Sequence, residues 1–186
     1  MVILDIRSRS AFREWLMANH AHEKECWIVA RRGKKPPENA LWYLDAVEEA
    51  LCFGWIDSTV KNVGGTIVQR FSPRSKKSQW TELNKERRRR LEALGLMTDS
   101  GRAVCPDLSV GFEMDKAVVD SFKANAVAWE NFNFFHPLYR RVRIDNIQRN
   151  KANRELFDYR LNKLIEASEK GKMIGDWNDD GRLIEY

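Results

Sequence analysis

The chain changes from helical to strand periodicity within the stretch Leu44-Asp45-Ala46-Val47-Glu48-Glu49-Ala50-Leu51-Cys52-Phe53-Gly54-Trp55-Ile56-Asp57. Apolar residues recur at helical spacing in its first half, which predicts a helix over residues 41–53. Gly54 follows the last turn, where the left-handed conformation that ends a helix favours glycine. The aromatic and β-branched residues after it predict a strand over residues 55–60. A helix that leads directly into a strand indicates a mixed fold.

Two further segments extend this strand into a small sheet. Residues 26–31 form a short aromatic and β-branched run, and residues 66–71 form another. The segment Asn62-Val63-Gly64-Gly65 lies between the strands 55–60 and 66–71. We therefore expect these two strands to form a hairpin whose loop is longer than the two-residue type.

Helices are predicted on both sides of these strands. Residues 10–19 carry apolar side chains at helical spacing, and Ser10 is the candidate N-terminal cap. Residues 79–94 form a second such segment, with Ser78 as the candidate cap. Gly95 follows this segment and supplies its left-handed stop.

The second half of the chain reads as helical. Residues 96–115 are interrupted by glycines and indicate a connection, and helical spacing prevails from residue 116 to residue 170. We predict an α+β domain over residues 1–110, with a small antiparallel or mixed sheet flanked by helices. A helical C-terminal region follows over residues 111–186.

Composition narrows the class of protein. The chain has 186 residues, of which 43% are hydrophobic and 32% charged, a globular profile. Three cysteines without a CxxC pair support neither a disulfide framework nor a cysteine-rich zinc site. No apolar run approaches the about 20 residues of a membrane helix, and Asp5 interrupts the N-terminal apolar run. We therefore expect a cytoplasmic protein without membrane insertion. The net charge of +5 permits an anionic partner without requiring one.

Acidic side chains gather on the helix predicted over residues 41–53. Asp45, Glu48, Glu49 and Cys52 stand at relative positions 0, 3, 4 and 7, which places them on one helical face. Asp57 follows on the next strand. Carboxylates beside a thiol suit general acid–base chemistry or a bound cation. The alternative is an ordinary solvated polar face of an amphipathic helix.

Basic and aromatic side chains interleave over residues 69–80. Arg70 and Arg74 lie in this segment together with lysines and Trp80, a combination that suits phosphate or stacked bases. Ser78 at the predicted helix start adds backbone N–H donors.

The alternative for these arginines is structural. Arg70 or Arg74 would pair with Glu49 or Asp57 and join strand to helix. The run Arg87-Arg88-Arg89-Arg90 spans a full helical turn, so its members cannot share one face, and we expect a solvated helix surface with Glu86 paired to Arg90.

Motifs for metals, cofactors and nucleophiles are weak. His20, His22 and Cys26 have a metal-like spacing but lack a nearby fourth ligand, so no metal is predicted. No GxSxG, P-loop, GxGxxG or HExxH sequence occurs, and no cofactor is predicted.

Several long motifs cover residues 12–101 and resemble the YdeI/OmpD-associated family, also called bacteriocin-protection proteins. The motifs are Glu48-Glu49-Ala50-Leu51-Cys52-Phe53-Gly54-Trp55-Ile56-Asp57-Ser58, Gln69-Arg70-Phe71-Ser72-Pro73-Arg74, Lys77-Ser78-Gln79-Trp80, Asn84 and Gly95-Leu96-Met97-Thr98. The segment from Arg140-Arg141 to Lys172 is similar to the closing helical segment of that family. The family's Thr-Arg pair is replaced there by Phe157-Asp158, ahead of Arg160-Leu161.

The resemblance implies an N-terminal domain related to the YjbR/CyaY-like group. It also implies a link to tolerance of bacteriocins and cationic antimicrobial peptides. It brings no established enzyme activity, cofactor or catalytic residue.

Three functions follow from these patterns. The first is a stress-tolerance protein that binds a small ligand or a protein partner in a pocket. The residues of that predicted pocket are Glu49, Cys52, Trp55, Asp57, Arg70, Arg74 and Trp80. The second is a nucleic-acid-binding module that uses Arg70, Arg74, Lys76 and Lys77 together with the basic helix that follows them. The third is a hydrolase or transferase with Asp57 or Glu49 as general base and an arginine holding an anionic substrate.

Overall fold

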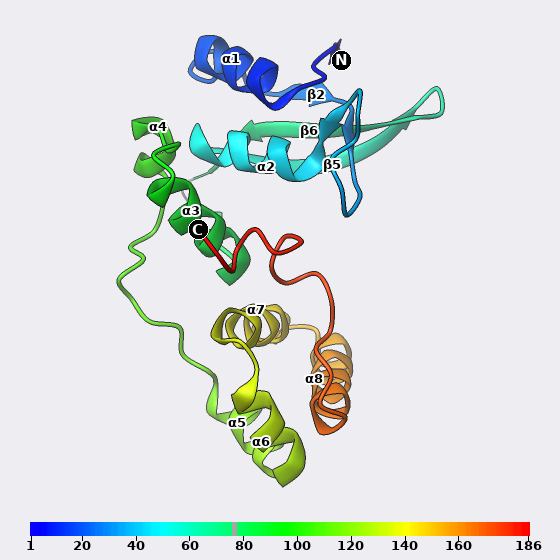
Figure 1. Ribbon diagram of the computed structural model, residues 1–186, viewed down its shortest axis with the longest axis vertical. Helices are drawn as coiled ribbons and strands as arrows, with labels where there is room; N and C mark the ends of the chain where they lie inside the picture. The colour runs from blue at the N-terminus through cyan, green and yellow to red at the C-terminus, as the bar shows by residue number, and fades with distance from the viewer. Residues whose placement is uncertain (76–77) are drawn as a thin grey trace. The chain divides into compact units, whose positions relative to one another are not determined.

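The computed structural model describes residues 1–75 and 78–186 and divides the chain into two units (Figure 1). The first unit comprises Met1–Gln79 and Arg87–Pro106, and the second comprises Trp80–Glu86 and Asp107–Tyr186. The predicted mixed architecture is confirmed, with a small sheet and helices in the first unit and helices in the second. Lys76 and Lys77 lie outside the described residues.

A mixed four-stranded sheet in the order β1-β2-β6-β5 forms the centre of the first unit. Its strands are β1 (Ile3–Leu4), β2 (Cys26–Ile28), β5 (Trp55–Val63) and β6 (Thr66–Pro73). β1 and β2 run parallel, and β6 runs antiparallel to both β2 and β5. A separate parallel pair joins β3 (Ala30–Arg31) to β4 (Leu41–Trp42).

The β5–β6 hairpin is tighter than the sequence suggested. Val63 pairs with Thr66, so Gly64 and Gly65 alone form the turn. Their φ angles of 56° and 83° are left-handed, as the turns that match the twist of a hairpin require. The prediction of a longer loop was wrong because β5 continues through Val63 instead of ending at residue 60.

Aromatic side chains from α1 (Arg9–Asn19) and from the sheet fill the core of the first unit. Phe12 meets Phe71 edge to face with 5.4 Å between ring centroids, and Trp15 meets Trp55 at 5.8 Å. Helix α1 therefore packs against the face of the sheet that carries Phe71, and it also packs against α2 (Tyr43–Cys52).

Caps define the ends of the helices. Ser8 and not Ser10 caps α1, because its Oγ accepts the N–H of Ala11 at 3.2 Å. Helix α3 (Glu82–Ala93) begins later than predicted, and Thr81 in place of Ser78 accepts the N–H of Asn84. Gly95, with φ of 68°, ends α3 as expected.

The C-terminal end of α2 lies against the short helix α4 (Asp99–Ala103). The carbonyl of Cys52 accepts both the N–H and the Oγ1–H of Thr98, at 3.1 and 2.6 Å. A Cβ on Gly101 would lie 2.1 Å from the same carbonyl oxygen, closer than any real contact. Only glycine therefore fits at position 101.

Four helices build the second unit around one apolar core. They are α5 (Lys116–Lys123), α6 (Ala126–Phe134), α7 (Pro137–Gln148) and α8 (Arg154–Glu169). Phe122 and Phe132 stack in this core with 4.6 Å between centroids. The C-terminal segment closes it, since Trp177 lies edge-on to Tyr139 at 5.5 Å.

Replacement of Gly101 by alanine tests the close approach of α4 to α2. Gly101→Ala should reduce the free energy of unfolding by about 1–3 kcal/mol, because the added methyl group forces backbone apart. Gly33→Ala is the control, since its Cβ would meet its nearest neighbour at an ordinary 3.6 Å. Urea denaturation followed by tryptophan fluorescence measures both variants. Equal stability of the two variants would contradict the packing described.

Candidate functional site

The residues of the predicted pocket lie in separate environments. Glu49 and Cys52 lie on α2, Arg13 of α1 contacts both, and all three belong to the buried packing of α1 on α2. Trp55 is buried at the start of β5, where its Nε1 donates to the carbonyl of His20 at 3.2 Å. These side chains fill space in the first unit.

Asp57 lies in a second environment, at the bulge of β5. Its Oδ2 accepts the hydroxyl of Tyr43 at 2.6 Å, and the guanidinium of Arg32 stacks 3.5 Å from the centroid of the Tyr43 ring. Burial raises the pKa of Tyr43 to about 12, and the Asp57 carboxylate adds to the shift. Tyr43 therefore stays protonated and donates this hydrogen bond to Asp57 throughout the neutral range.

The two arginines of the predicted pocket have partners of their own. Arg70 on β6 pairs with Glu25 at 2.6 Å, and Nη1 of Arg74 donates to the carbonyl of Gln79 at 3.2 Å. Trp80 belongs to the second unit. The expected pairing of Arg70 with Glu49 or Asp57 was wrong, because strand pairing places Arg70 beside β2 and the segment before it.

An ion network joins α2 to α1 and α3 within the first unit. Arg9 donates to Glu48 at 2.7 Å and to Glu49 at 2.6 Å, and Arg13 donates to Glu49 at 2.7 Å. Arg90 of α3 donates to the other oxygen of Glu48 at 2.8 Å. Each of the two carboxylates therefore accepts from two arginines.

The depth of this network corrects the view of α2 as a helix with a solvated acidic face. Glu48 and Glu49 expose 0% and 1% of their surface. Burial alone would lower the pKa of the Arg9 guanidinium, but attraction by Glu48 and Glu49 outweighs burial and raises it. The arginine run on α3 is likewise not a simple solvated surface, since Arg90 pairs with Glu48 instead of Glu86.

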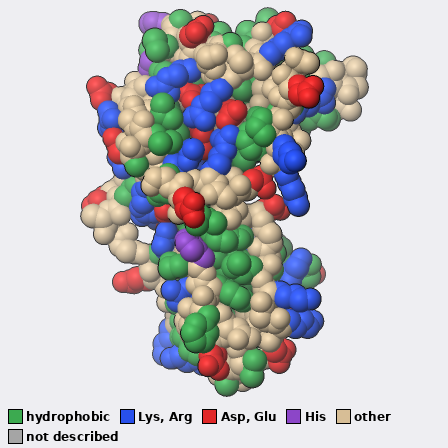
Figure 2. Space-filling model, viewed as in Figure 1, with side chains coloured by type: hydrophobic (Ala, Val, Ile, Leu, Met, Phe, Trp, Pro, Cys, Tyr) green, Lys and Arg blue, Asp and Glu red, His purple; other side chains and the backbone are tan. Residues whose placement is uncertain are grey.

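Charged side chains of both signs also alternate over the outside of the first unit (Figure 2). Glu92 accepts from Arg102 at 2.9 Å and from Arg88 at 3.1 Å, and Arg102 also donates to Asp99. The surface arginines Arg88 and Arg102 thus contact carboxylates, as does Arg70, one of the two arginines considered for an anion site.

The thiols and imidazoles of the first unit are held in structural contacts. Burial raises the pKa of Cys26 and of Cys52 to about 12, so neither is a thiolate at neutral pH. Nδ1 of His20 donates to the carbonyl of Leu16 at 2.8 Å, and its Nε2 lies 3.0 Å from Oγ of Ser100. Among residues 1–75 and 78–186, no group of three or more Asp, Glu, His or Cys residues is arranged to hold a metal ion.

A cationic hollow of about 180 Å³ lies between α7 and α8 in the second unit. We call it the basic hollow, and it is lined by Arg143, Asn146, Ile147, Tyr159, Arg160, Lys163, Leu164 and Ile174. Three of these residues are cationic and none is a carboxylate. Lys and Arg side chains gather over α8 on the face of the second unit seen in Figure 2.

The arginines of the basic hollow are positioned by backbone contacts. Nη1 of Arg160 donates to the carbonyl of Asn146 at 3.0 Å and also to its side-chain oxygen. Nη2 of Arg143 donates to the carbonyl of Ile174 at 2.9 Å. In the described part of the chain, neither arginine forms an ion pair with a carboxylate.

The positive charge of Arg143 is only partly compensated by its surroundings. Burial lowers the pKa of this guanidinium, although Tyr139 and Asp176 act in the opposite direction. The Nε of Arg143 is buried without a hydrogen-bond partner among the described residues. A partly buried cation whose charge is only partly matched is a preferred place for an anion to bind.

A second hollow of about 250 Å³ shares a wall with the first. Both are lined by Arg143, Asn146 and Arg160, and the second, which we call the polar hollow, adds Thr81, Leu83, Val142, Asp145, Arg149, Asn150 and Asp176. Asp145 accepts the N–H of Glu82 at 3.0 Å, and burial raises the pKa of its carboxyl. The polar hollow therefore presents both donors and acceptors.

None of the residues of the basic hollow was predicted as a site. The available signal is spacing: Arg143, Asn146 and Ile147 share one face of α7, and Arg160, Lys163 and Leu164 share one face of α8. The run around Arg143 indicates only a helix surface, because nothing local tells which of its faces another helix will cover.

The fold and the hollows define a mixed α/β protein with an appended helical unit that holds a cationic candidate binding site. Residues 4–104 match the family described as a domain of unknown function (DUF8412), and the chain belongs to this family. Comparison with curated proteins and with solved structures found no match. The resemblance to YdeI/OmpD-associated proteins stays a prediction.

The matched segment ends before α5, so the basic hollow lies outside it. Within the described ranges, 1–75 and 78–186, no helix has the length and apolar character needed to cross a membrane.

Removal of one buried carboxylate tests the structural role of the ion network. Glu49→Gln should lower the free energy of unfolding by about 3–5 kcal/mol, because it leaves Arg9 and Arg13 without their shared partner. Asp5→Asn is the control, since the Asp5–Arg7 pair is exposed and its loss should leave stability unchanged. Thermal and urea unfolding measure the difference. A Glu49→Gln variant as stable as the control would show that the network does not hold the helices.

Proposed function

We propose that the protein binds a small oxyanion-bearing ligand and that the basic hollow receives its anionic group. The observation that carries the proposal is the gathering of Arg143, Arg160 and Lys163 around one hollow without a carboxylate. The second unit as a whole contains 16 acidic and 14 basic residues, so this gathering does not follow from its composition.

The chemistry of the lining favours phosphate. Arginine presents planar forks of N–H donors that match phosphate and carboxylate oxygens, and lysine adds a point charge. Arg160 uses one nitrogen to contact Asn146, and Arg143 uses one to contact Ile174, so further donors of both remain for a ligand. Lys163 is exposed and can follow the ligand as it binds.

Two alternatives from the sequence have less support. Catalysis by Glu49 or Asp57 would need a free carboxylate, yet Glu49 accepts from two arginines and Asp57 accepts from Tyr43. Nucleic-acid binding through the first unit would need unpaired cations, yet Arg70 pairs with Glu25. The binding of a small ligand in the second unit meets neither objection.

The resemblance to bacteriocin-protection proteins supplies a cellular setting for this proposal. A cationic hollow repels cationic peptides, so direct capture of such a peptide is not the route that we propose. We place the protein in the cytoplasm, where the anionic ligand would bind and tolerance would depend on the bound state.

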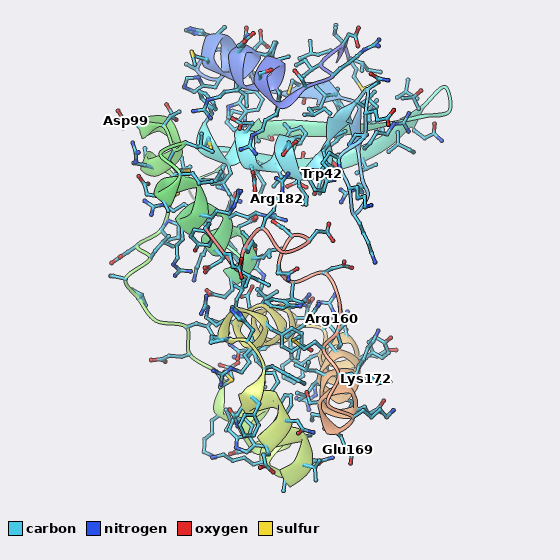
Figure 3. All side chains as sticks on the ribbon, viewed as in Figure 1. Trp42, Asp99, Arg160, Glu169, Lys172 and Arg182 are labelled. Carbon is cyan, nitrogen blue, oxygen red and sulfur yellow. The ribbon has the colours of Figure 1, made fainter. Side chains whose placement is uncertain are left out.

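Anion binding is tested by calorimetric titration of the full chain with inorganic phosphate and pyrophosphate. Lys163→Gln and Arg160→Gln should each weaken binding about tenfold or more, because a hydrogen bond to a charged group contributes about 1.5–3 kcal/mol. Lys172→Gln is the matched control: Arg160 lies on the α7 side of α8, whereas Lys172 lies past the helix end (Figure 3). Absence of binding at low salt, or equal weakening in all three variants, would disprove the proposal.

The proposed link to tolerance makes a separate prediction. Bacteria that express the wild-type chain should survive a bacteriocin or cationic peptide better than bacteria that express Lys163→Gln at the same level. The Lys172→Gln variant should protect as well as the wild type. Equal protection by wild type and Lys163→Gln would separate any tolerance from the basic hollow.

A further inference from the structure

We propose that the ligand is a mononucleotide, with its phosphate at Arg143 and Arg160 and its base against Tyr159. This inference rests on the function proposed above and narrows it to one chemical class. Three features of the two hollows carry it: an exposed aromatic ring, an apolar wall and a neighbouring set of hydroxyl-binding groups. An inorganic anion would use none of them.

The aromatic ring is that of Tyr159, which lines the basic hollow although 60% of its surface is exposed. Lys163 follows one helical turn later, and its Nζ lies 5.8 Å from the ring centroid. An aromatic ring beside cations is the arrangement on which a base stacks while its phosphate is held. Stacking accepts any base, because every base has a π-face.

Three apolar side chains also line the basic hollow. Ile147 and Leu164 belong to the buried core of the second unit, and Ile174 is half-buried. A planar ring in the hollow would cover the exposed part of Ile174 and remove that apolar surface from water. This exposed apolar surface offers nothing to a free phosphate ion.

The polar hollow would hold the sugar of the mononucleotide. It meets the basic hollow at Arg143, Asn146 and Arg160, where the phosphate would sit. Asn150 and Asp176 also line the polar hollow, and their side chains can accept hydrogen bonds from hydroxyl groups. In the described chain Asp176 forms no ion pair, although it is close enough to influence the charge on Arg143.

Size points to the same class of ligand. The hollows measure about 180 and 250 Å³, and each is smaller than the roughly 300 Å³ at which pockets for drug-sized ligands begin. Because the two hollows have different linings, a ligand that extends from one to the other needs at least two chemically different parts. A ring and a phosphate joined by a polyol meet that need.

The inference is tested by calorimetric titration of the full chain with adenosine 5′-monophosphate, uridine 5′-monophosphate, ribose 5-phosphate and inorganic phosphate. Both nucleotides should bind at least tenfold more tightly than ribose 5-phosphate. Tyr159→Leu should weaken nucleotide binding more than ribose 5-phosphate binding and so remove that advantage. Tyr159→Phe should preserve the advantage, because it keeps the ring. Both variants change an exposed side chain, and circular dichroism checks that they fold.

The outcomes separate this inference from the proposed function. Equal affinity for nucleotides and ribose 5-phosphate, with no effect of Tyr159→Leu, would overturn the nucleotide class while anion binding stands. A 5′-phosphorylated oligonucleotide that binds where the mononucleotides do not would also overturn it, in favour of nucleic acid. Failure of all four small probes to bind would refute the proposed function itself.

Discussion

The burial of Glu48 and Glu49 is the constraint on which the first unit depends. A carboxylate removed from water without partners carries a penalty of several kcal/mol, so this helix can pack only where arginines meet it. Arg9 and Arg13 come from a helix about 36–40 positions earlier, and Arg90 comes from one 42 positions later. The network therefore specifies how α1, α2 and the C-terminal part of α3 are arranged. Its value lies in specificity more than in net stability, because well-packed apolar side chains in the same place would hold the helices as strongly.

The same network explains why net charge is a poor guide to function in this chain. The first unit contains 18 basic and 11 acidic residues, the larger excess of the two units. Yet its arginines largely meet carboxylates, as Arg9 does inside the fold and as Arg70 and Arg102 do at the surface. The second unit has a slight acidic excess but gathers at one place three cations that form no ion pair among the described residues. The distribution of unmatched charge, and not its sum, indicates where an anion would bind.

The parts of the fold that depend on local pattern could be predicted, and the parts that depend on distant contacts could not. Helix 41–53, its stop at Gly54 and the strand that follows were recovered, because spacing and glycine act within a few residues. The acidic face of α2 was misread, since its partners come from α1 and α3. Nothing of the candidate site was predicted. The helix that carries Arg160 was predicted. Which of its faces meets α7, however, is decided only by the packing of the whole unit.

The contrast between the two charged clusters also decides which of them is suited to ligand binding. In the buried network each carboxylate already accepts from two arginines, so a ligand would have to displace strong, desolvated contacts to enter. In the basic hollow the situation differs: burial lowers the pKa of the partly buried Arg143, whereas the carboxylates of the network raise the pKa of Arg9, and among the described residues Arg143 forms no ion pair with a carboxylate. Such a group destabilises the empty protein and is relieved when an anion arrives. A fold keeps such a destabilising group where ligand binding compensates for the lost stability. This is the physical reason to seek the function in the helical unit and not in the domain that defines the family.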